Sequence, residues 1–97
     1  NERAVLSGHT VQGEPFAIVP VAAILVAGIR LHCTGQVFNQ NYTGPQRVNT
    51  HAPIRKGEEL GWFEHGSTIV LFVPPSWKLV PGMEEGGQLR MGQALFE

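Results

Sequence analysis

Thr68-Ile69-Val70-Leu71-Phe72-Val73 is the stretch of sequence that decides the fold. It is apolar almost throughout and combines β-branched and aromatic side chains, which favours a β-strand. Because apolar residues follow one another without polar alternation, the stretch predicts a central strand covered on both faces. Pro74-Pro75 ends it, since proline has no N–H group with which to continue a strand ladder.

Glycine and proline interrupt the rest of the chain at short intervals. The 12 glycines and 7 prolines leave pieces too short for amphipathic helices, and many of these pieces suit strands. The further strands that we expect are Ala4–Ser7, Phe16–Val19, Ala23–Val26, Ile29–Cys33, Gln36–Asn39, Gln46–Asn49, Leu60–Glu64 and Gln93–Phe96. Met83–Gly87 is a predicted loop. No repeat or linker divides the chain, so residues 1–97 are expected to form a single all-β domain.

The most apolar run of the chain is Phe16–Ile29, which has 14 residues. A membrane-spanning helix needs about 20 residues, and Pro20 would break a helix within this run. The β-branched residues of the run predict buried strands with a kink at Pro20, and insertion into a membrane is the alternative.

Charge and cysteine content exclude several classes of protein. Seven basic residues face eight acidic ones, so there is no excess positive charge for binding nucleic acid. Cys33 is the single cysteine, so no disulfide scaffold is expected. Charged residues make up 15% of the chain, against about 25% in an ordinary soluble domain. Either the surface meets a membrane or a partner, or the chain belongs to something larger.

Lys56-Gly57-Glu58-Glu59-Leu60-Gly61 resembles the turns of lipoyl-like and barrel-sandwich domains. Glycines allow tight corners between short strands in such domains. The resemblance implies a small multi-stranded barrel or sandwich of the barrel-sandwich hybrid type. A modified lysine of the lipoyl kind at Lys56 is the alternative to an ordinary turn residue, although the neighbours of such a lysine are absent here.

Gly66-Ser67-Thr68, directly before the strongest strand, could carry an unusual reaction. The Ser67 hydroxyl could attack the Gly66 carbonyl, which no side chain obstructs, and so move the acyl group from nitrogen to oxygen. β-Elimination and hydrolysis would then leave a pyruvoyl group at a new N-terminus. Such a carbonyl condenses with a substrate amine and accepts electrons. A turn with its hydroxyl bonded to nearby backbone is the alternative.

His65 and Thr68 flank this serine and could assist it. In an extended chain, residues i and i+2 share a face, so His65 could act as the base that deprotonates Ser67. A half-exposed histidine packed on a neighbour is the alternative. Thr68 could hydrogen-bond near the cleavage site or be an ordinary threonine on a strand face.

The remaining polar and aromatic residues form no recognised motif. His9, His32 and His51 lack metal-ligand spacing among themselves and with Cys33, so no metal site is expected. Cys33 is expected to be a small buried residue rather than a nucleophile. Glu58-Glu59 and Glu84-Glu85 are adjacent pairs, and the two side chains of each pair point to opposite sides of an extended chain. All four side chains are expected to be solvated. Trp62 and Trp77 suit either a core or a lipid interface.

The chain resembles the C-terminal, cleavage-site-bearing part of bacterial phosphatidylserine decarboxylase proenzymes. Five blocks carry the resemblance, in the order and at spacings similar to those of the family. They are Asn1-Glu2-Arg3, Val21-Ala22-Ala23 with Val26-Ala27-Gly28-Ile29, Lys56-Gly57-Glu58-Glu59-Leu60-Gly61 with Phe63, Gly66-Ser67-Thr68 with Val70 and Phe72, and Met91-Gly92-Gln93-Ala94.

The resemblance implies a function and a site. Autocleavage between Gly66 and Ser67 would convert Ser67 into the pyruvoyl cofactor. The enzyme would decarboxylate phosphatidylserine to phosphatidylethanolamine as a peripheral protein on the cytoplasmic side of a bacterial inner membrane. Its partners would be the lipid, the membrane surface and the N-terminal part of the proenzyme, and a homodimer is compatible with this expectation.

The sequence also departs from the family. His65 stands where the family commonly has a hydrophobic residue. Family members are much longer, and their N-terminal region holds the membrane-associating segment and the acid and histidine that activate the serine. The isolated chain is therefore expected to be inactive. A non-catalytic β module with a structural Gly-Ser turn, and a pyruvoyl decarboxylase of soluble amino acids, remain as alternative hypotheses.

Overall fold

A computed structural model describes residues 3–22, 28–34, 36–38, 52–64 and 67–97 of the chain. The described residues form strands and no helix, so the prediction of an all-β fold is confirmed. The strands are β1 (Leu6–His9), β2 (Pro15–Val21), β3 (Ile29–Leu31), β4 (Gln36–Phe38), β5 (Gly61–Phe63) and β6 (Thr68–Phe72). No described segment forms a helix with the length and apolar character needed to cross a membrane.

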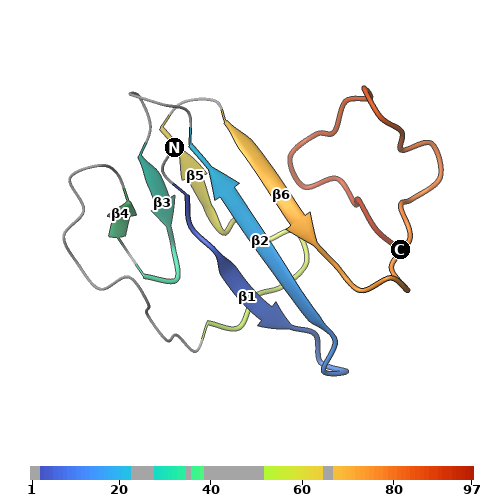
Figure 1. Cartoon of the computed structure of the whole chain (residues 1–97), viewed down its shortest axis with the longest axis horizontal. Coiled ribbons are helices and arrows are strands. Elements are labelled where there is room, and N and C mark those ends of the chain that lie inside the picture. The colour runs from blue at the N-terminus through green and yellow to red at the C-terminus, as the bar shows by residue number, and fades with distance from the viewer. Residues whose placement is uncertain (1–2, 23–27, 35, 39–51, 65–66) are drawn as a thin grey trace.

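The strands pair into two antiparallel sheets of three strands each (Figure 1). The first sheet has the order β1-β2-β6, and the second has the order β4-β3-β5. A tight turn joins β1 to β2, in which the Gly13 N–H donates to the Thr10 carbonyl at 2.9 Å. Gly13 has a φ of 86°, a conformation that glycine adopts at little cost.

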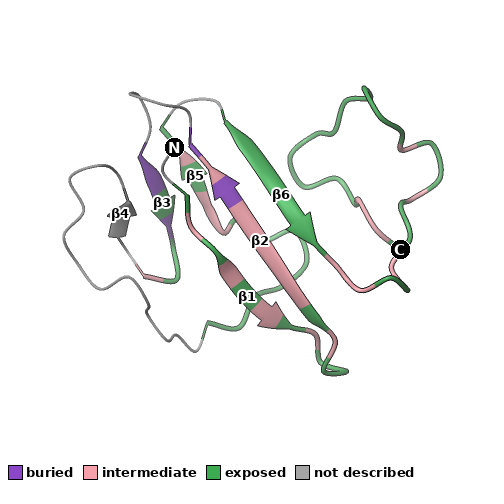
Figure 2. Ribbon diagram, in the orientation of Figure 1, coloured by how far each residue is buried: buried purple, intermediate pink, exposed green. Residues whose placement is uncertain are grey.

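A small core lies between the two sheets. Its buried residues are Ala22, Ile29 and Leu31. Ala4, Leu6 and Phe63 pack against them and are partly buried. The buried colour in Figure 2 lies on β3, on the end of β2 and on the chain that directly follows β2. This packing is that of a small sandwich, and the described strands do not trace a closed barrel, so barrel closure remains a prediction.

Pro20 lies inside β2, so the strand does not end before the proline, as the expected bounds Phe16–Val19 implied, but continues through this position to Val21. The Pro20 carbonyl accepts the N–H of Ala4 at 3.2 Å. In an antiparallel strand the N and C=O of one residue point toward the same neighbour. The missing N–H of Pro20 therefore faces Ala4, which precedes β1, and costs no hydrogen bond toward Ile69 of β6.

The prediction that Thr68–Val73 forms a strand is confirmed for β6, but its predicted central position is wrong. Among the described strands β6 pairs with β2 alone and lies at the edge of its sheet. All five of its residues are exposed (Figure 2). The sequence pattern of a covered strand is present, yet no described part of this chain supplies the cover.

The other strand predictions have mixed outcomes. Gln93–Phe96 is wrong as a strand, because only an isolated bridge joins Phe96 to Leu79. Met83–Gly87 lies in a turn region, as expected. The strands expected at Ala23–Val26 and Gln46–Asn49 lie outside the described residues.

Candidate active site

Ser67 and Thr68 lie where the chain passes from one sheet to the other. The chain leaves the second sheet after β5 at Glu64, whose N–H donates to the Gly28 carbonyl at 3.0 Å. It enters the first sheet at Thr68, which pairs with Val21 of β2. Ser67 and Thr68 are both exposed. His65 and Gly66, the other two residues of the predicted site, lie outside the described residues.

Arg3 shares a row of the first sheet with Thr68, although the sequence pattern did not assign it to the site. Val21 pairs with Thr68 on one side and forms an isolated bridge with Arg3 on the other. Residues in one row of an antiparallel sheet point to the same face. The exposed Arg3 therefore places a positive charge on the face of the sheet that carries the Thr68 side chain. Only the strand register reveals this, because the two residues are far apart in sequence.

Charged and aromatic side chains gather on the exposed side of β3 and β5. The Arg30 guanidinium lies 5.7 Å from the centre of the Trp62 ring, and its Nε lies 3.7 Å from a Glu64 carboxylate oxygen. His32 contacts the same ring at 5.4 Å and lies 3.8 Å from a carboxylate oxygen of Glu59. Exposed ion pairs contribute at most about 1 kcal/mol, so this cluster orders the surface more than it stabilises the fold.

The structure corrects one prediction for the remaining candidates and locates the others. Cys33 is exposed, so the prediction that it is buried is wrong. The core side of β3 ends at Leu31, and Cys33 belongs to the turn that follows. Lys56 also lies in a turn and is exposed, and the acidic residues 58, 59, 84 and 85 are exposed, as expected. Among the described residues no group of three or more His, Cys, Asp or Glu is arranged to hold a metal ion.

Glu14 connects the β1–β2 turn to the segment that follows β6. Its carboxylate accepts hydrogen bonds from Ser76 Oγ at 3.1 Å and from Trp77 Nε1 at 3.5 Å. The Trp77 ring also contacts Phe16 at 6.2 Å and Phe96 at 5.7 Å, measured between ring centres. Trp77 is thus a packing residue here, whereas Trp62 is 47% exposed. We name this arrangement of Glu14, Ser76 and Trp77 the Glu14 clamp.

Comparison with known proteins places this two-sheet β protein in a family of decarboxylases. The sequence model of the phosphatidylserine decarboxylase family matches residues 1–97, so the chain belongs to that family. No solved structure matches the chain.

Three relatives illustrate the match, and each is named phosphatidylserine decarboxylase proenzyme. The protein of Alcanivorax borkumensis is 39% identical over 94% of this chain and 32% of its own length. That of Pseudomonas fluorescens is 41% identical over 100% of this chain and 36% of its own length. The mitochondrial protein of Cricetulus griseus is 36% identical over 98% of this chain and 26% of its own length. The chain thus spans about a third or less of the relatives it matches.

Proposed function

We propose that this chain is the cleavage-site-bearing part of a pyruvoyl-dependent decarboxylase that converts phosphatidylserine to phosphatidylethanolamine. The observation that carries the proposal is the family match over residues 1–97, which includes Gly66-Ser67-Thr68. The exposed position of Ser67 at the start of β6 supports it, because the reacting group must be accessible to a substrate. The relatives are named proenzymes, which fits a chain that is activated by cleavage.

Ser67 is the residue from which the catalytic carbonyl forms. Its Oγ attacks the Gly66 carbonyl carbon, and the acyl group moves from the Ser67 nitrogen to Oγ. β-Elimination then removes the Cα proton of Ser67, breaks its Cβ–Oγ bond and releases the chain up to Gly66 as a carboxylate. Water hydrolyses the remaining dehydroalanine, releases ammonia and leaves a pyruvoyl group at the start of residues 67–97.

The described residues fit a pyruvoyl group at position 67 in two ways: Ser67 is exposed, and the strand that follows it is anchored in the first sheet. The ladder between β2 and β6 holds Thr68 opposite Val21, so the new N-terminus would stay at the same place on the first sheet. Once formed, the pyruvoyl group supplies an electron sink that stabilises the carbanion left on the substrate by the loss of carbon dioxide.

Arg3 is suited to attract the head group of the substrate. The phosphatidylserine head group carries a phosphate and a carboxylate, and a guanidinium binds both kinds of oxyanion through paired hydrogen bonds. Arg3 lies two strands from Thr68 on the same row, which is about 10 Å between backbones. A long arginine side chain can span much of this distance to a head group bound at Ser67.

The substrate is a membrane lipid, so we propose that the enzyme acts as a peripheral protein at the cytoplasmic face of a bacterial inner membrane. The bacterial origin of two of the relatives supports the bacterial setting of this proposal. The N-terminal part of the proenzyme is the proposed partner of this chain, and a homodimer is its proposed assembly. We expect the isolated 97-residue chain to be inactive without that partner.

Turnover by the full-length parent protein tests this function. The parent is incubated with vesicles that contain phosphatidylserine, and phosphatidylethanolamine is measured together with carbon dioxide. Ser67→Ala should abolish turnover, whereas Ser76→Ala, which removes a hydroxyl beyond the other end of β6, should retain it. Turnover of soluble amino acids with none of the lipid would reject phosphatidylserine as the substrate. Full turnover by Ser67→Ala would reject the pyruvoyl mechanism.

A further inference from the structure

The first sheet carries apolar side chains on the face that points away from the core. Side chains alternate between the two faces of a strand, and paired residues share a face. Ala4 and Leu6 face the core, so the residues between and beside them face outward. The register continues from the Arg3–Val21 bridge to the Leu6–Ile18 pair, which places Val5 opposite Val19. We call the outward apolar residues the outer face: Val5, Ala17, Val19, Val21, Val70 and Phe72.

The outer face is unusual for a surface that meets water. An antiparallel sheet with one solvated face normally alternates apolar residues inside with polar residues outside. Here Val5 is 65% exposed, Phe72 is 61% exposed and Val70 is 41% exposed. A contiguous apolar patch of this kind marks an interaction site more often than it marks a free surface.

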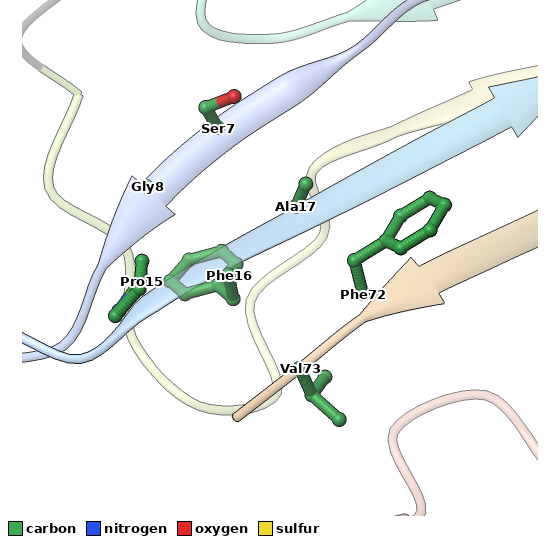
Figure 3. Close-up of a pocket in the computed structure, with 7 residues that line it drawn as sticks. All are labelled: Ser7, Gly8, Pro15, Phe16, Ala17, Phe72 and Val73. Carbon is green, nitrogen blue, oxygen red and sulfur yellow. The ribbon is translucent and has the colours of Figure 1, made fainter. Parts of the chain in front are cut away.

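The outer face also borders a hollow at one end of the first sheet. Ser7, Ala17 and Phe72 form one row across the three strands on the outer face, and Figure 3 shows the small Ala17 between Ser7 and the large Phe72 ring. Together with Phe16 and Val73, which alternate to the other face, these residues line an open hollow of about 350 Å³. A side chain from another segment could fill this hollow, as knobs fill holes in a packed core.

Strand β6 lacks cover on its other side as well. Ile69 and Leu71 point toward the core side of the sheet, yet they remain 56% and 36% exposed. Among the described strands, the edge of β6 that faces away from β2 has no partner, and such an edge can accept another strand. The strand is therefore apolar, exposed on both faces and open along one edge.

We propose that the outer face and the open edge of β6 form the docking surface for the rest of the parent proenzyme, outside these 97 residues. The relatives carry about two thirds or more of their length outside the matched part, which is enough chain to form another layer. A membrane is the weaker candidate, because anionic lipid attracts clusters of basic residues. Arg3 and His9 are the basic side chains that the described register places on this face, at opposite ends of the sheet.

The position of this surface has a consequence for Ser67. Thr68 lies in the same row as Val21 of the outer face, and Ser67 precedes it directly. A segment docked on β6 therefore lies beside the proposed reaction centre and can bring catalytic side chains to it. Cleavage at Ser67 would then depend on docking of the rest of the parent chain. The inference rests on membership of a longer proenzyme and not on decarboxylation.

Cysteine accessibility in the full-length parent protein tests the docking surface. Val5→Cys and Val70→Cys are made in a parent whose native cysteines, including Cys33, are replaced by serine. Val11→Cys, in the turn between β1 and β2, is the control, because Val11 is fully exposed and lies away from the outer face. Labelling by a maleimide is timed without lipid, and the urea midpoint of each variant shows that it is folded.

We expect the thiols of Val5→Cys and Val70→Cys to react at least about tenfold more slowly than the thiol of Val11→Cys, because a docked layer restricts access to them. Equal rates in all three variants would overturn the proposal. Protection that develops only when phosphatidylserine vesicles are added would show that a membrane covers the face. Protection that is lost on dilution would show that a second copy covers it. Either result would also overturn the proposal, whatever the turnover assay gives.

A photo-crosslinker in place of Phe72 identifies the covering segment. We expect crosslinked peptides that join position 72 to residues of the same chain outside the 97-residue part. Crosslinks that join two copies of the chain would reject the assignment. Crosslinks to lipid alone, or the absence of any crosslink to protein, would also reject it. Placing the same crosslinker at Val11 provides the background, since this position should capture no protein segment.

Discussion

The proposed cleavage at Ser67 requires a base that removes the proton of its hydroxyl group. His65 is the proposed base, because two residues separated by one position share a face of an extended chain. His65→Ala should slow cleavage of the parent protein by about 100-fold or more, which is the usual contribution of a positioned base. Time-resolved gel analysis of newly made protein measures this rate. His9→Ala, at the far end of β1, is the control, and a cleavage rate for His65→Ala equal to that of this control would show that the base lies elsewhere.

Arg3 tests the proposed recognition of the lipid head group. Arg3→Gln removes the charge and should raise KM for phosphatidylserine by about tenfold, the value of one lost charged hydrogen bond. Arg3→Lys should recover part of this loss, because it restores the charge without the fork of donors. Steady-state kinetics on vesicles measures both, with Arg90→Gln in the exposed C-terminal segment as the control. A KM for Arg3→Gln that equals that of the control would remove Arg3 from the site.

At the scale of elements, the pairing of β3 with β5 depends on Gly61. A Cβ at this position would collide with the Arg30 carbonyl oxygen of the facing strand. Gly61→Ala should therefore destabilise the protein by about 3 kcal/mol, at the upper end for overpacking, and loosen the second sheet. Urea unfolding gives the free energy, and hydrogen exchange at the His32 amide, which donates to Leu60, reports the local effect.

Gly13→Ala is the matched control for Gly61→Ala. Gly13 has a positive φ but no atom near its missing Cβ, so the substitution should cost only about 1 kcal/mol and spare the His32 amide. Equal losses in the free energy of unfolding for Gly61→Ala and Gly13→Ala, with no change in hydrogen exchange at the His32 amide, would show that β3 and β5 do not approach each other this closely.

The Glu14 clamp ties the segment after β6 to the first sheet. After the proposed cleavage, residues 67–97 would be held to the rest of the protein by non-covalent contacts, among them the β2–β6 ladder and the clamp. Glu14→Ala should weaken this association by about 1 kcal/mol, the net worth of a hydrogen bond. The urea concentration at which the fragment 67–97 separates during size-exclusion chromatography measures it. Glu85 is an exposed glutamate in the last segment, so Glu85→Ala, the control, should leave that urea concentration unchanged. An unchanged urea concentration for Glu14→Ala as well would show that the clamp contributes nothing.

The sequence predicts which segments form strands better than it predicts where each strand lies in a sheet and what covers it. The strands at β2, β3, β5 and β6 follow from β-branched and aromatic runs between glycines, which depend on local preferences. The edge position of β6 could not be predicted, since its apolar pattern describes a covered strand and the cover is not among the described residues. Gln93–Phe96 failed because a short apolar piece without a long partner forms only a bridge.

The residues of the candidate site also separate into those that the local sequence predicts and those that only the structure reveals. Ser67 and Thr68 follow from local sequence, because a Gly-Ser junction before a strong strand is visible without a structure. Arg3 and the Glu14 clamp depend on register and on contacts between distant segments, which no local pattern encodes. Glu14 and Trp77, for example, are 63 positions apart.

At the scale of the whole molecule, the outer face gives the low charge content a physical meaning. Charged residues are 15% of the chain, and the outer face shows where an ordinary domain would carry more of them. The core within the described residues has three buried hydrophobic residues, Ala22, Ile29 and Leu31. Burial of so few side chains offsets little of the conformational entropy lost on folding. A docked partner layer would add the missing burial.

The intact mass of the parent protein, purified from a host that produces it in full, tests the central claim most directly. We predict two fragments, with the break between Gly66 and Ser67. The fragment 67–97 should be lighter, by the mass of one ammonia, than the same fragment with serine at its start, and a hydrazide reagent should label it. A single uncleaved chain, or a fragment that begins with unmodified serine and takes up no label, would contradict the account.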